Sequence, residues 1–455
     1  MNITVELLKR YDRPGPRYTS FPPATEFHSG VGEPELAEHL ERASRLEAPL
    51  SFYAHLPFCE ERCLYCGCNV VITKRRDVLR RYLDHLYREI RDLAARLGER
   101  RRLSQYHLGG GTPTYLTPDE LRELHGVITS EFTVEPAAEV AIEVDPRVTS
   151  EEHLAVLREL GFNRLSLGVQ DFTREVQEAV DRVQSYESTR DQVALARRLG
   201  FESINIDLIY GLPFQKPLTF CRTLELLREI RPDRVAVYSY AHVPWIRGQQ
   251  REIDPASLPG PETKMELFAT AVRELTRAGY LSIGMDHFAL PEDEMGRAVA
   301  AGKLWRNFMG YTVSHAPDMI GCGASGISDV AGAYFQNVKK LSRYEELVGA
   351  GRLPTERGCV LTRDDSIRRH VITSLMCNFT ARIREIEDLH NIAFWEYFAK
   401  EREGLTPLIA DGFVAIHPDR LDVVGIGRRF IRNVCMIFDP YLEKDGAEPR
   451  FSRTV

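Results

Sequence analysis

The chain has 455 residues, which is enough for one large domain and a smaller one, each with its own hydrophobic core. Its composition of 43% hydrophobic and 27% charged residues, without a dominant low-complexity tract, is that of an ordinary soluble protein. The formal net charge of -7 lacks the electrostatic footprint of a nucleic-acid-binding protein and gives no reason to expect a role at a membrane surface.

The N-terminal segment MNITVELLKRYDRPGPRYTS has no apolar stretch of the kind that a secretory signal needs. No uninterrupted apolar run in the sequence approaches the ~18 residues of a membrane span. We therefore expect a cytoplasmic protein that binds neither nucleic acid nor a membrane.

Short β-rich runs alternate with stretches of helical periodicity between residues 50 and 240. The predicted strands are 51–56, 104–110, 139–145, 163–170, 203–211 and 233–240. Two connecting segments, 149–162 and 189–201, have i, i+3, i+4 apolar spacing and end on Leu-Gly-Phe, a helix-stop signal. This alternation predicts an α/β fold with a parallel sheet. Six units without the length or symmetry of a closed eight-fold ring favour a partial (β/α)6 barrel, and a doubly wound sheet is the alternative.

The carboxyl ends of the strands point into the ligand site in either fold. Small or polar residues stand there regularly, which a chemically inert sheet would not need. They are Cys59, Gly109–Gly111, Glu143, Asp145, Gln170, Asp207 and Tyr240.

Four of the nine cysteines fall within ten residues, in the segment HLPFCEERCLYCGCN. Thiolates select iron–sulfur clusters or zinc, and zinc sites usually add a second Cys or His pair, which this sequence lacks at a suitable spacing. Cys59, Cys63 and Cys66 on one tight loop can hold three irons of a cubane and leave the fourth open, as cleavage of S-adenosylmethionine (SAM) requires. We interpret Cys68 as a non-ligand near the site. The other five cysteines are scattered, and we expect them to be buried core thiols.

Further polar residues are suited to a nucleoside ligand. The GGGTP loop, which contains Gly110, Gly111 and Thr112, lets the backbone approach a ligand closely. The carboxylates of Glu143 and Asp207 suit ribose hydroxyls, and the Arg182 fork suits a carboxylate. Each of these residues also has a simpler interpretation, as part of a turn, a solvated loop or a local salt bridge.

The sequence changes character after residue 360. Residues 361–379 open a helical region, and 413–425 contain two short strands about a turn. We predict a smaller, mainly helical, winged-helix-like domain here, without an identifiable basic face for DNA.

The sequence resembles the oxygen-independent coproporphyrinogen III oxidases (coproporphyrinogen dehydrogenases) of the radical SAM superfamily over nearly its whole length. The C-x3-C-x2-C spacing, with Tyr65 before the third cysteine, is similar to the superfamily motif. The more specific stretches are GPRYTSFP, LGGGTPTYL, IEVDPR, GFNRLSLGVQDF, NIDLIYGLP, the YAH run, IGMDHFA and LTRDDSIRRHVI. The resemblance implies an N-terminal extension over the active site (1–48), a radical SAM partial barrel (49–355) and a C-terminal helical domain (356–455).

The resemblance also implies roles for individual residues. Cys59, Cys63 and Cys66 would ligate a [4Fe–4S] cluster, and Tyr53, His55 and Cys68 are the candidates for catalysis. The residues implied in SAM binding are Tyr53, Gly110, Gly111, Thr112, Glu143, Gln170, Arg182, Asp207 and Ala241, with Ile327 at a second SAM. Met309 replaces the family's usual glutamine near that second site, where a polar contact is lost.

The implied reaction converts two propionate groups of coproporphyrinogen III to vinyl groups, giving protoporphyrinogen IX. A 5′-deoxyadenosyl radical takes a hydrogen from the β-carbon of a propionate, CO2 leaves, and one electron passes to an acceptor. Because the substrate carries four carboxylates, Arg251, Arg306 and Lys303 are candidates to bind it. The implied partners are this substrate and an unidentified electron donor and acceptor, and the resemblance suggests a monomer.

Two alternatives remain. A related radical SAM branch carries intact haem, but it typically lacks the GPRYTS-like segment and the cysteine after the third ligand, both present here. A zinc-stabilised binding protein, from a different class, would hold tetrahedral zinc through all four clustered cysteines.

Overall fold

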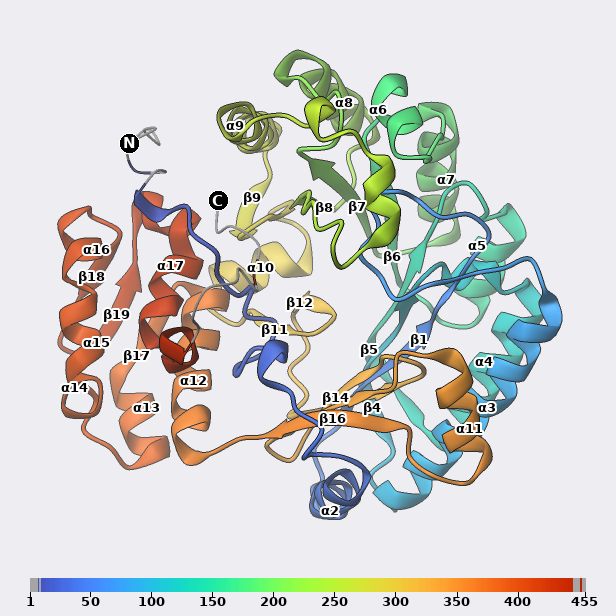
Figure 1. Ribbon diagram of the computed structural model, residues 1–455, viewed down its shortest axis with the longest axis horizontal. Coiled ribbons are helices and arrows are strands. Elements are labelled where there is room, and N and C mark those ends of the chain that lie inside the picture. Colours follow the sequence, from blue (N-terminus) through green and yellow to red (C-terminus); the bar gives the residue numbers. More distant parts are fainter. Residues whose placement is uncertain (1–6, 8–9, 445–450, 452–455) are drawn as a thin grey trace.

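Six parallel strands lie side by side in chain order within a twelve-stranded sheet (Figure 1). The computed structural model describes residues 7, 10–444 and 451. The six strands are β1 (Leu50–Leu56), β4 (Arg102–Gly110), β5 (Thr133–Val144), β6 (Arg164–Gln170), β7 (Ser203–Tyr210) and β8 (Arg234–Ser239). Sequential order is that of a barrel wall, whereas a doubly wound sheet reverses its order at a switch point. The predicted partial (β/α)6 barrel is therefore confirmed.

Further strands extend the sheet at both ends. Strand β13 (Asp318–Cys322) pairs in parallel with β1, although about 260 residues separate them, and β14 (Ile327–Val330), β15 (Ala333–Asn337) and β16 (Thr355–Val360) follow in antiparallel pairing. At the opposite end β10 (His287–Ala289) and β9 (Leu281–Gly284) continue antiparallel from β8. Two small ribbons lie outside this sheet: β2 (Phe58–Cys59) with β3 (Val71–Ile72), and β11 (Trp305–Asn307) with β12 (Gly310–Thr312).

Helices connect the parallel strands and cover the sheet. They are α3 (Arg76–Leu97), α4 (Pro118–Glu131), α5 (Glu151–Glu159), α6 (Arg174–Ala179), α7 (Tyr186–Leu199) and α8 (Pro217–Ile230). Side-chain caps fix where α4 and α5 begin, because Thr117 and Ser150 accept the N–H groups of Glu120 and His153. The two helices predicted from the sequence are confirmed as α5 and α7, and α7 ends at Gly200 in a left-handed conformation (φ 91°). Further helices before residue 350 are α2 (Glu33–Ser44), α9 (Pro261–Arg277), α10 (Glu294–Ala300) and α11 (Leu341–Gly349).

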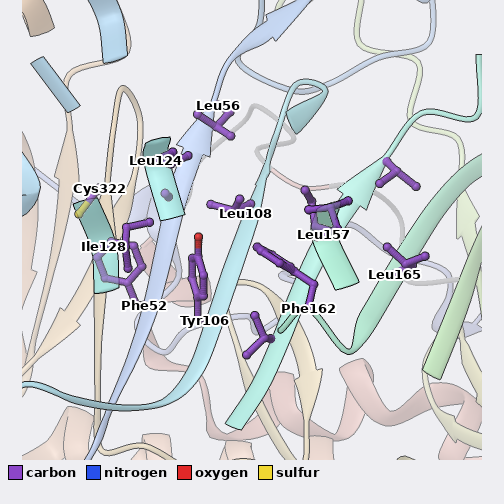
Figure 2. Packing of buried hydrophobic residues seen from close by; sticks show 14 of the residues in the cluster. Phe52, Leu56, Tyr106, Leu108, Leu124, Ile128, Leu157, Phe162, Leu165 and Cys322 are labelled. Atoms are coloured by element: carbon purple, nitrogen blue, oxygen red, sulfur yellow. The ribbon is translucent and has the colours of Figure 1, made fainter. Parts of the chain in front are cut away.

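Alternate residues of the strands serve two different environments. Phe52 and Leu56 of β1 pack with Tyr106 and Leu108 of β4 against the α4 helix (Figure 2). Because side chains alternate along a strand, the intervening residues face the barrel interior. Those interior residues are largely polar, and they include His55, His107, Glu143, Ser166 and Asp207.

The C-terminal residues form helices around a small antiparallel sheet. The helices are α12 (Arg363–Asn378), α13 (Ile383–His390), α14 (Phe394–Tyr397), α15 (Ala399–Gly404), α16 (Thr406–Ala410) and α17 (Ile431–Cys435). The two predicted strands are confirmed as β18 (Val414–Ile416) and β19 (Arg420–Val423), and β17 (Thr380–Arg382) completes the sheet. The hydrophobic core of this region also contains Tyr11, Tyr18 and Phe21 from the N-terminal segment.

Cysteines outside the cluster mostly lie in the core, as predicted. Cys322, Cys359, Cys377 and Cys435 are buried, and Cys221 is half-buried. Within the described part of the chain, no helix combines the length and the apolar character needed to cross a membrane.

Candidate active site

A cavity of about 420 Å³ lies at the carboxyl ends of the parallel strands. Twelve of the residues singled out in the sequence line it: Cys59, Cys63, Cys66, Cys68, Gly110, Gly111, Thr112, Glu143, Asp145, Gln170, Arg182 and Asp207. The fold therefore brings together residues that are spread over about 150 positions of the sequence. Asp207 lies within β7 rather than at its end, so it reaches the cavity from the barrel interior.

The cysteine loop follows β1 and is held by its neighbours. The Cys59 thiol lies 3.4 Å from the Thr112 hydroxyl, and the Cys66 sulfur accepts the N–H of Cys68 at 3.4 Å. The loop carbonyls of Cys66 and Tyr65 accept the side-chain amides of Gln249 and Gln250 at 2.7 and 3.1 Å. These contacts hold the backbone of the loop in place, so that the thiols face the cavity.

The glycine loop after β4 comes too close to its neighbours to accommodate side chains. A Cβ at Gly110 would lie 2.7 Å from the His55 ring, and the φ of 120° there also disfavours other residues. A Cβ at Gly111 would lie 2.8 Å from the Phe58 carbonyl oxygen. The backbone N–H of Gly110 donates to Glu143 at 3.0 Å, so the loop and the β5 carboxylate form one unit.

Two carboxyl groups of the cavity have opposite protonation tendencies. Burial alone would raise the pKa of Glu143, but the nearby His107 and the Gly110 N–H outweigh it and lower that pKa. Burial raises the pKa of Asp207 to about 7, against the hydrogen bonds from Asn205 and Ser166. Glu143 therefore offers an acceptor for a hydroxyl group, whereas Asp207 can also donate a hydrogen bond near neutral pH.

Two guanidinium groups lie beside the cysteine loop. Arg182 donates to Asp145 at 2.9 Å and approaches the Cys63 sulfur at 3.5 Å, and Arg147 also contacts both groups, at 2.8 and 3.5 Å. Burial alone would raise the pKa of Asp145, but the charge of Arg182 and the contacts with Arg147 lower it. Arg147 was not predicted as a site residue, although the IEVDPR stretch contains it.

The donor set fits the cofactors of the superfamily. Three thiols share one cavity with two cations that favour their thiolate form. The buried Nε of Arg182 has no acceptor in the structure, which suits an incoming carboxylate. Among the described residues, no three His, Cys, Asp or Glu side chains are arranged to hold a single metal ion. A polynuclear cluster instead takes one thiolate per iron, so its ligands can lie further apart.

A smaller cavity of about 120 Å³ continues toward the barrel interior. It shares Glu143, Ser166, Asp207 and Tyr238 with the larger one, and Met309 lines it at the β11–β12 turn. Ser166 and Tyr238 were not predicted as site residues. The period-two alternation of β6 and β8 could have placed them on the interior face.

Four predicted site residues do not line the larger cavity. Tyr53 stacks on His107 with ring centroids 5.8 Å apart, and its hydroxyl lies 3.0 Å from Nδ1 of His55, whose Nε2 lies 3.1 Å from the Asn69 carbonyl oxygen. The carbonyl of Ala241 accepts from Gln250, and Ile327 packs in a small apolar cluster with Tyr334.

Among the basic candidates for substrate binding, Arg306 is buried, whereas Arg251 and Lys303 are exposed. Tyr240, which was expected at a strand end, is buried beside the site, with its hydroxyl 3.0 Å from His242.

Comparisons with known proteins match both parts of the fold. A family model of the radical SAM superfamily matches residues 53–227, and a model of the HemN C-terminal domain matches residues 361–430. The oxygen-independent coproporphyrinogen III oxidase of Pseudomonas aeruginosa is 43% identical over 452 residues, covering 99% of this chain and 98% of that protein. Its namesake in Escherichia coli K12 is 44% identical over 449 residues, with the same coverage.

A solved structure agrees with this assignment. Coproporphyrinogen III oxidase (HemN) from Escherichia coli, described as a radical SAM enzyme, has a TM-score of 0.92 and 43% identity. The match covers 97% of this chain and 99% of that one, so the fold agrees from the N-terminal segment to the C-terminal helices. Membership of the superfamily implies a [4Fe–4S] cluster and SAM. Because identity above 40% extends over nearly the whole sequence, the chain belongs to the oxygen-independent coproporphyrinogen III oxidase family of the radical SAM superfamily.

Proposed function

We infer that the protein catalyses the oxygen-independent oxidative decarboxylation of coproporphyrinogen III. Two propionate groups become vinyl groups, two CO2 are released, and the product is protoporphyrinogen IX. The observation that carries this conclusion is the similarity over nearly the whole chain to oxidases of that name, together with one cavity that unites the cysteines, the glycine loop and the polar strand residues.

Cys59, Cys63 and Cys66 hold the cluster through their thiolates, with Cys68 as a free thiol at the cavity wall. When bound, the cluster and SAM supply the 5′-deoxyadenosyl radical that removes a hydrogen atom from the substrate. Arg147 and Arg182 are cations within 3.5 Å of the Cys63 sulfur, so they stabilise its thiolate charge.

The remainder of the larger cavity would hold SAM. The backbone of Gly110, Gly111 and Thr112 would meet its amino-acid part, and the Nε of Arg182 would be available to its carboxylate. Glu143 accepts hydrogen bonds from hydroxyl groups, and Asp207 can also donate one to them. Gln170 lines the same wall. Apolar and aromatic side chains, among them Tyr65, Tyr115 and Tyr238, complete the wall.

Tyr53, His55 and Cys68 are the chain's candidates for moving protons beside the reacting centre. The Tyr53 hydroxyl and the His55 ring are in hydrogen-bond contact, and burial lowers the pKa of His55. A neutral imidazole at physiological pH can accept a proton, which supports a role in proton transfer.

Ile327 and Met309 would lie at a second SAM. Met309 has no polar group to replace the glutamine of the family, so this site is expected to bind more weakly than the first. The physiological partners are a one-electron donor and an electron acceptor. The protein acts as a cytoplasmic monomer with the three units 1–48, 49–355 and 356–455, the first extending over the active site.

An anaerobic assay tests the reaction. The reconstituted protein, with reductant and SAM, is expected to convert coproporphyrinogen III to the divinyl product and to release two CO2 per substrate. Haem binding without decarboxylation would instead support the haem-carrying relatives, and a colourless protein with zinc on the four cysteines would support the binding-protein alternative.

A single substitution tests the cluster ligands. Cys63→Ser is expected to abolish the visible iron–sulfur absorption and reductive SAM cleavage, because one iron loses its thiolate. The half-buried Cys221 on α8 provides the control: Cys221→Ser should keep both. Unchanged absorption in the Cys63 variant would contradict the ligand assignment.

A further inference from the structure

Arg306 is a buried cation with unused hydrogen-bond donors. The residue is only 8% exposed, and its Nε and Nη1 have no acceptor. A buried guanidinium without partners costs considerable free energy, so such a group needs a compensating role. Its position on β11 is fixed, because the ring of Tyr311 lies against it at 4.5 Å and the Tyr311 hydroxyl donates to the Met376 carbonyl oxygen at 3.1 Å.

Arg306 lines a third, small cavity, separate from the two cavities of the active site, and a second side chain without a hydrogen-bond partner lines it as well. The Ser20 hydroxyl, also buried, has no hydrogen-bond partner. The cavity lies between the N-terminal segment 18–21, strand β11 and helix α12, and it leaves about 10 Å³, room for one oxygen-sized group. Two kinds of donor, a guanidinium and a hydroxyl, therefore border a space for an acceptor atom.

The neighbouring acids already form ion pairs with other basic residues, and none of the ion pairs between residues that the structure describes includes Arg306. Asp329 forms an ion pair with Arg369, which lines the same cavity. Asp286 is paired with Arg17 and lies 2.8 Å from Nδ1 of His287. The local charge is therefore positive, and the missing acceptor is an anion rather than another side chain.

The β11–β12 hairpin contributes residues to the small cavity and to the 120 Å³ cavity of the active site. Asn307 lines the small cavity and donates to the Gln105 side chain at 3.2 Å. Gln105 in turn lines the 120 Å³ cavity of the active site, the inner cavity. Tyr311, which packs on Arg306, also lines the inner cavity. Figure 1 shows this hairpin between the barrel and the C-terminal helices, beside the blue N-terminal segment.

We propose that Arg306 and Ser20 form a carboxylate-binding subsite that anchors the substrate at a distance from the cluster. This inference rests on the proposed function. Coproporphyrinogen III has four propionates and only two react, so the other two are available as permanent anchors. Binding energy from such non-reacting groups holds the reacting propionate in position. The GPRYTS segment, residues 15–20, thereby gains a role as one wall of the subsite.

A binding titration tests the subsite without requiring turnover. Coproporphyrin III, the stable oxidised form with the same four propionates, is titrated into the reconstituted protein and followed by its fluorescence. Arg306→Met is expected to raise its Kd about tenfold or more, as loss of a charge-assisted hydrogen bond predicts. The Kd of the uncharged tetramethyl ester should change by less than about twofold. Arg222→Met, an exposed arginine on α8, is the matched control and should leave both values unchanged.

A SAM titration separates the two possible sources of the carboxylate. If Arg306→Met weakens SAM binding alone, the carboxylate belongs to SAM and the substrate assignment is overturned. If neither affinity changes, or if acid and ester weaken equally, the cavity holds only water and the whole proposal is overturned.

Folding of the variants is checked by thermal unfolding. Arg306→Met should melt no lower than the wild type, because it removes an unpaired buried charge. If Arg306→Met fails to fold, Ser20→Ala provides the same readout. It should raise the Kd of coproporphyrin III by a smaller factor and leave the Kd of the tetramethyl ester unchanged. Failure of the proposed function is distinguishable, since a wild type that binds coproporphyrin III but never decarboxylates the substrate would leave the Kd comparison intact.

Discussion

Asp207 and Glu143 face the same cavity, yet their carboxyl groups differ in how readily they ionise. Hydrogen bonding to His107 and the Gly110 N–H lowers the pKa of Glu143 despite its burial. Burial raises the pKa of Asp207 to about 7, and the negative charge of Glu143 adds to that effect. One site thus contains an ionised carboxylate and a carboxyl group that is half-protonated near neutral pH.

This difference predicts a stabilising substitution in the active site. In the unfolded chain Asp207 ionises near pH 4, whereas in the folded protein it does so near pH 7, so folding takes up a proton between these values. Its contribution to the free energy of unfolding therefore falls as pH rises from about 4 to about 7 and stays low above that. Asp207→Asn should raise the stability at pH 8 by about 1–2 kcal/mol, less than a dry site would give, because the cavity admits water.

Urea unfolding of the cluster-loaded protein without SAM, at pH 5 and pH 8, measures this effect. The difference in the free energy of unfolding between Asp207→Asn and the wild type should be larger at pH 8 than at pH 5. The exposed carboxylate of Asp191 on α7 supplies the control Asp191→Asn, with equal effects at both pH values. A gap that shrinks toward pH 8 would show that Asp207 ionises readily in the folded protein.

Single residues were predictable from the sequence where loop position decides their place. The cysteines and the glycine loop directly follow strands, so their meeting at one edge required only strand order. Arg147 was missed because its place depends on its contact with Cys63. Ser166 and Tyr238 were missed although the alternation of β6 and β8 indicates their interior face. Whether Tyr53 lines the cavity depends likewise on its packing against His107.

At the scale of elements, β13 is one of the strands that the sequence did not reveal. It is a five-residue strand, and it joins β1 after an excursion through the β9–β12 region. Local periodicity cannot identify the partner of so short a strand, whereas the six predicted strands were marked by repeating βαβ units. A buried ion pair fixes β13 in place: Asp318 accepts from Arg100 and from the Ala331 N–H at 2.7 Å.

Loss of the Asp318 charge should therefore loosen that edge of the barrel. Arg100 and Asp318 are 2% and 4% exposed, and Arg100 also donates to the carbonyl oxygens of Ala43 and Ala48. Asp318→Asn keeps the shape but leaves a buried cation unneutralised, which costs about 3–5 kcal/mol. Thermal or urea unfolding measures the loss. Asp84→Asn, which breaks the exposed pair with Arg80 on α3, should cost less than about 1 kcal/mol. If the two substitutions lowered the free energy of unfolding equally, the buried ion pair would not be what stabilises the position of β13.

At the scale of the whole molecule, the N-terminal segment joins the barrel to the C-terminal region. Figure 1 shows its blue trace running beside the red helices toward the centre. Tyr11, Tyr18 and Phe21 pack in the C-terminal core, and Arg432 donates to the carbonyl oxygens of Gly15 and Pro16. Between these contacts, Arg17 reaches Asp286 just before β10. The sequence marked this segment only by resemblance, since its partners lie about 270 to 420 residues away.

Asp286 should hold this segment by balancing the positive charge around it. Burial would raise the pKa of Asp286, but Arg17, His287 and Arg306 lower it well below its usual range. Its stabilising effect is therefore fully present above about pH 4 and is lost only as the pH falls further. Asp286→Asn leaves Arg17, Arg306 and Arg432 facing one another without a counter-charge, at a cost of about 3–5 kcal/mol.

Hydrogen exchange followed by mass spectrometry should detect the release directly. Peptides covering residues 11–21 are expected to exchange at least about tenfold faster in Asp286→Asn, while peptides from α4 and α5 on the far side of the barrel keep their wild-type rates. The control is Asp411→Asn, which breaks the outer contacts of the same segment with Arg10 and Tyr11; Arg10 is exposed, so the loss should stay below about 1 kcal/mol. If residues 11–21 remain protected in Asp286→Asn although the protein is destabilised, the aromatic packing of Tyr11, Tyr18 and Phe21 alone fixes the segment. In that case the ion pair would only relieve the repulsion among the arginines, and the barrel and the C-terminal region would stay joined without it.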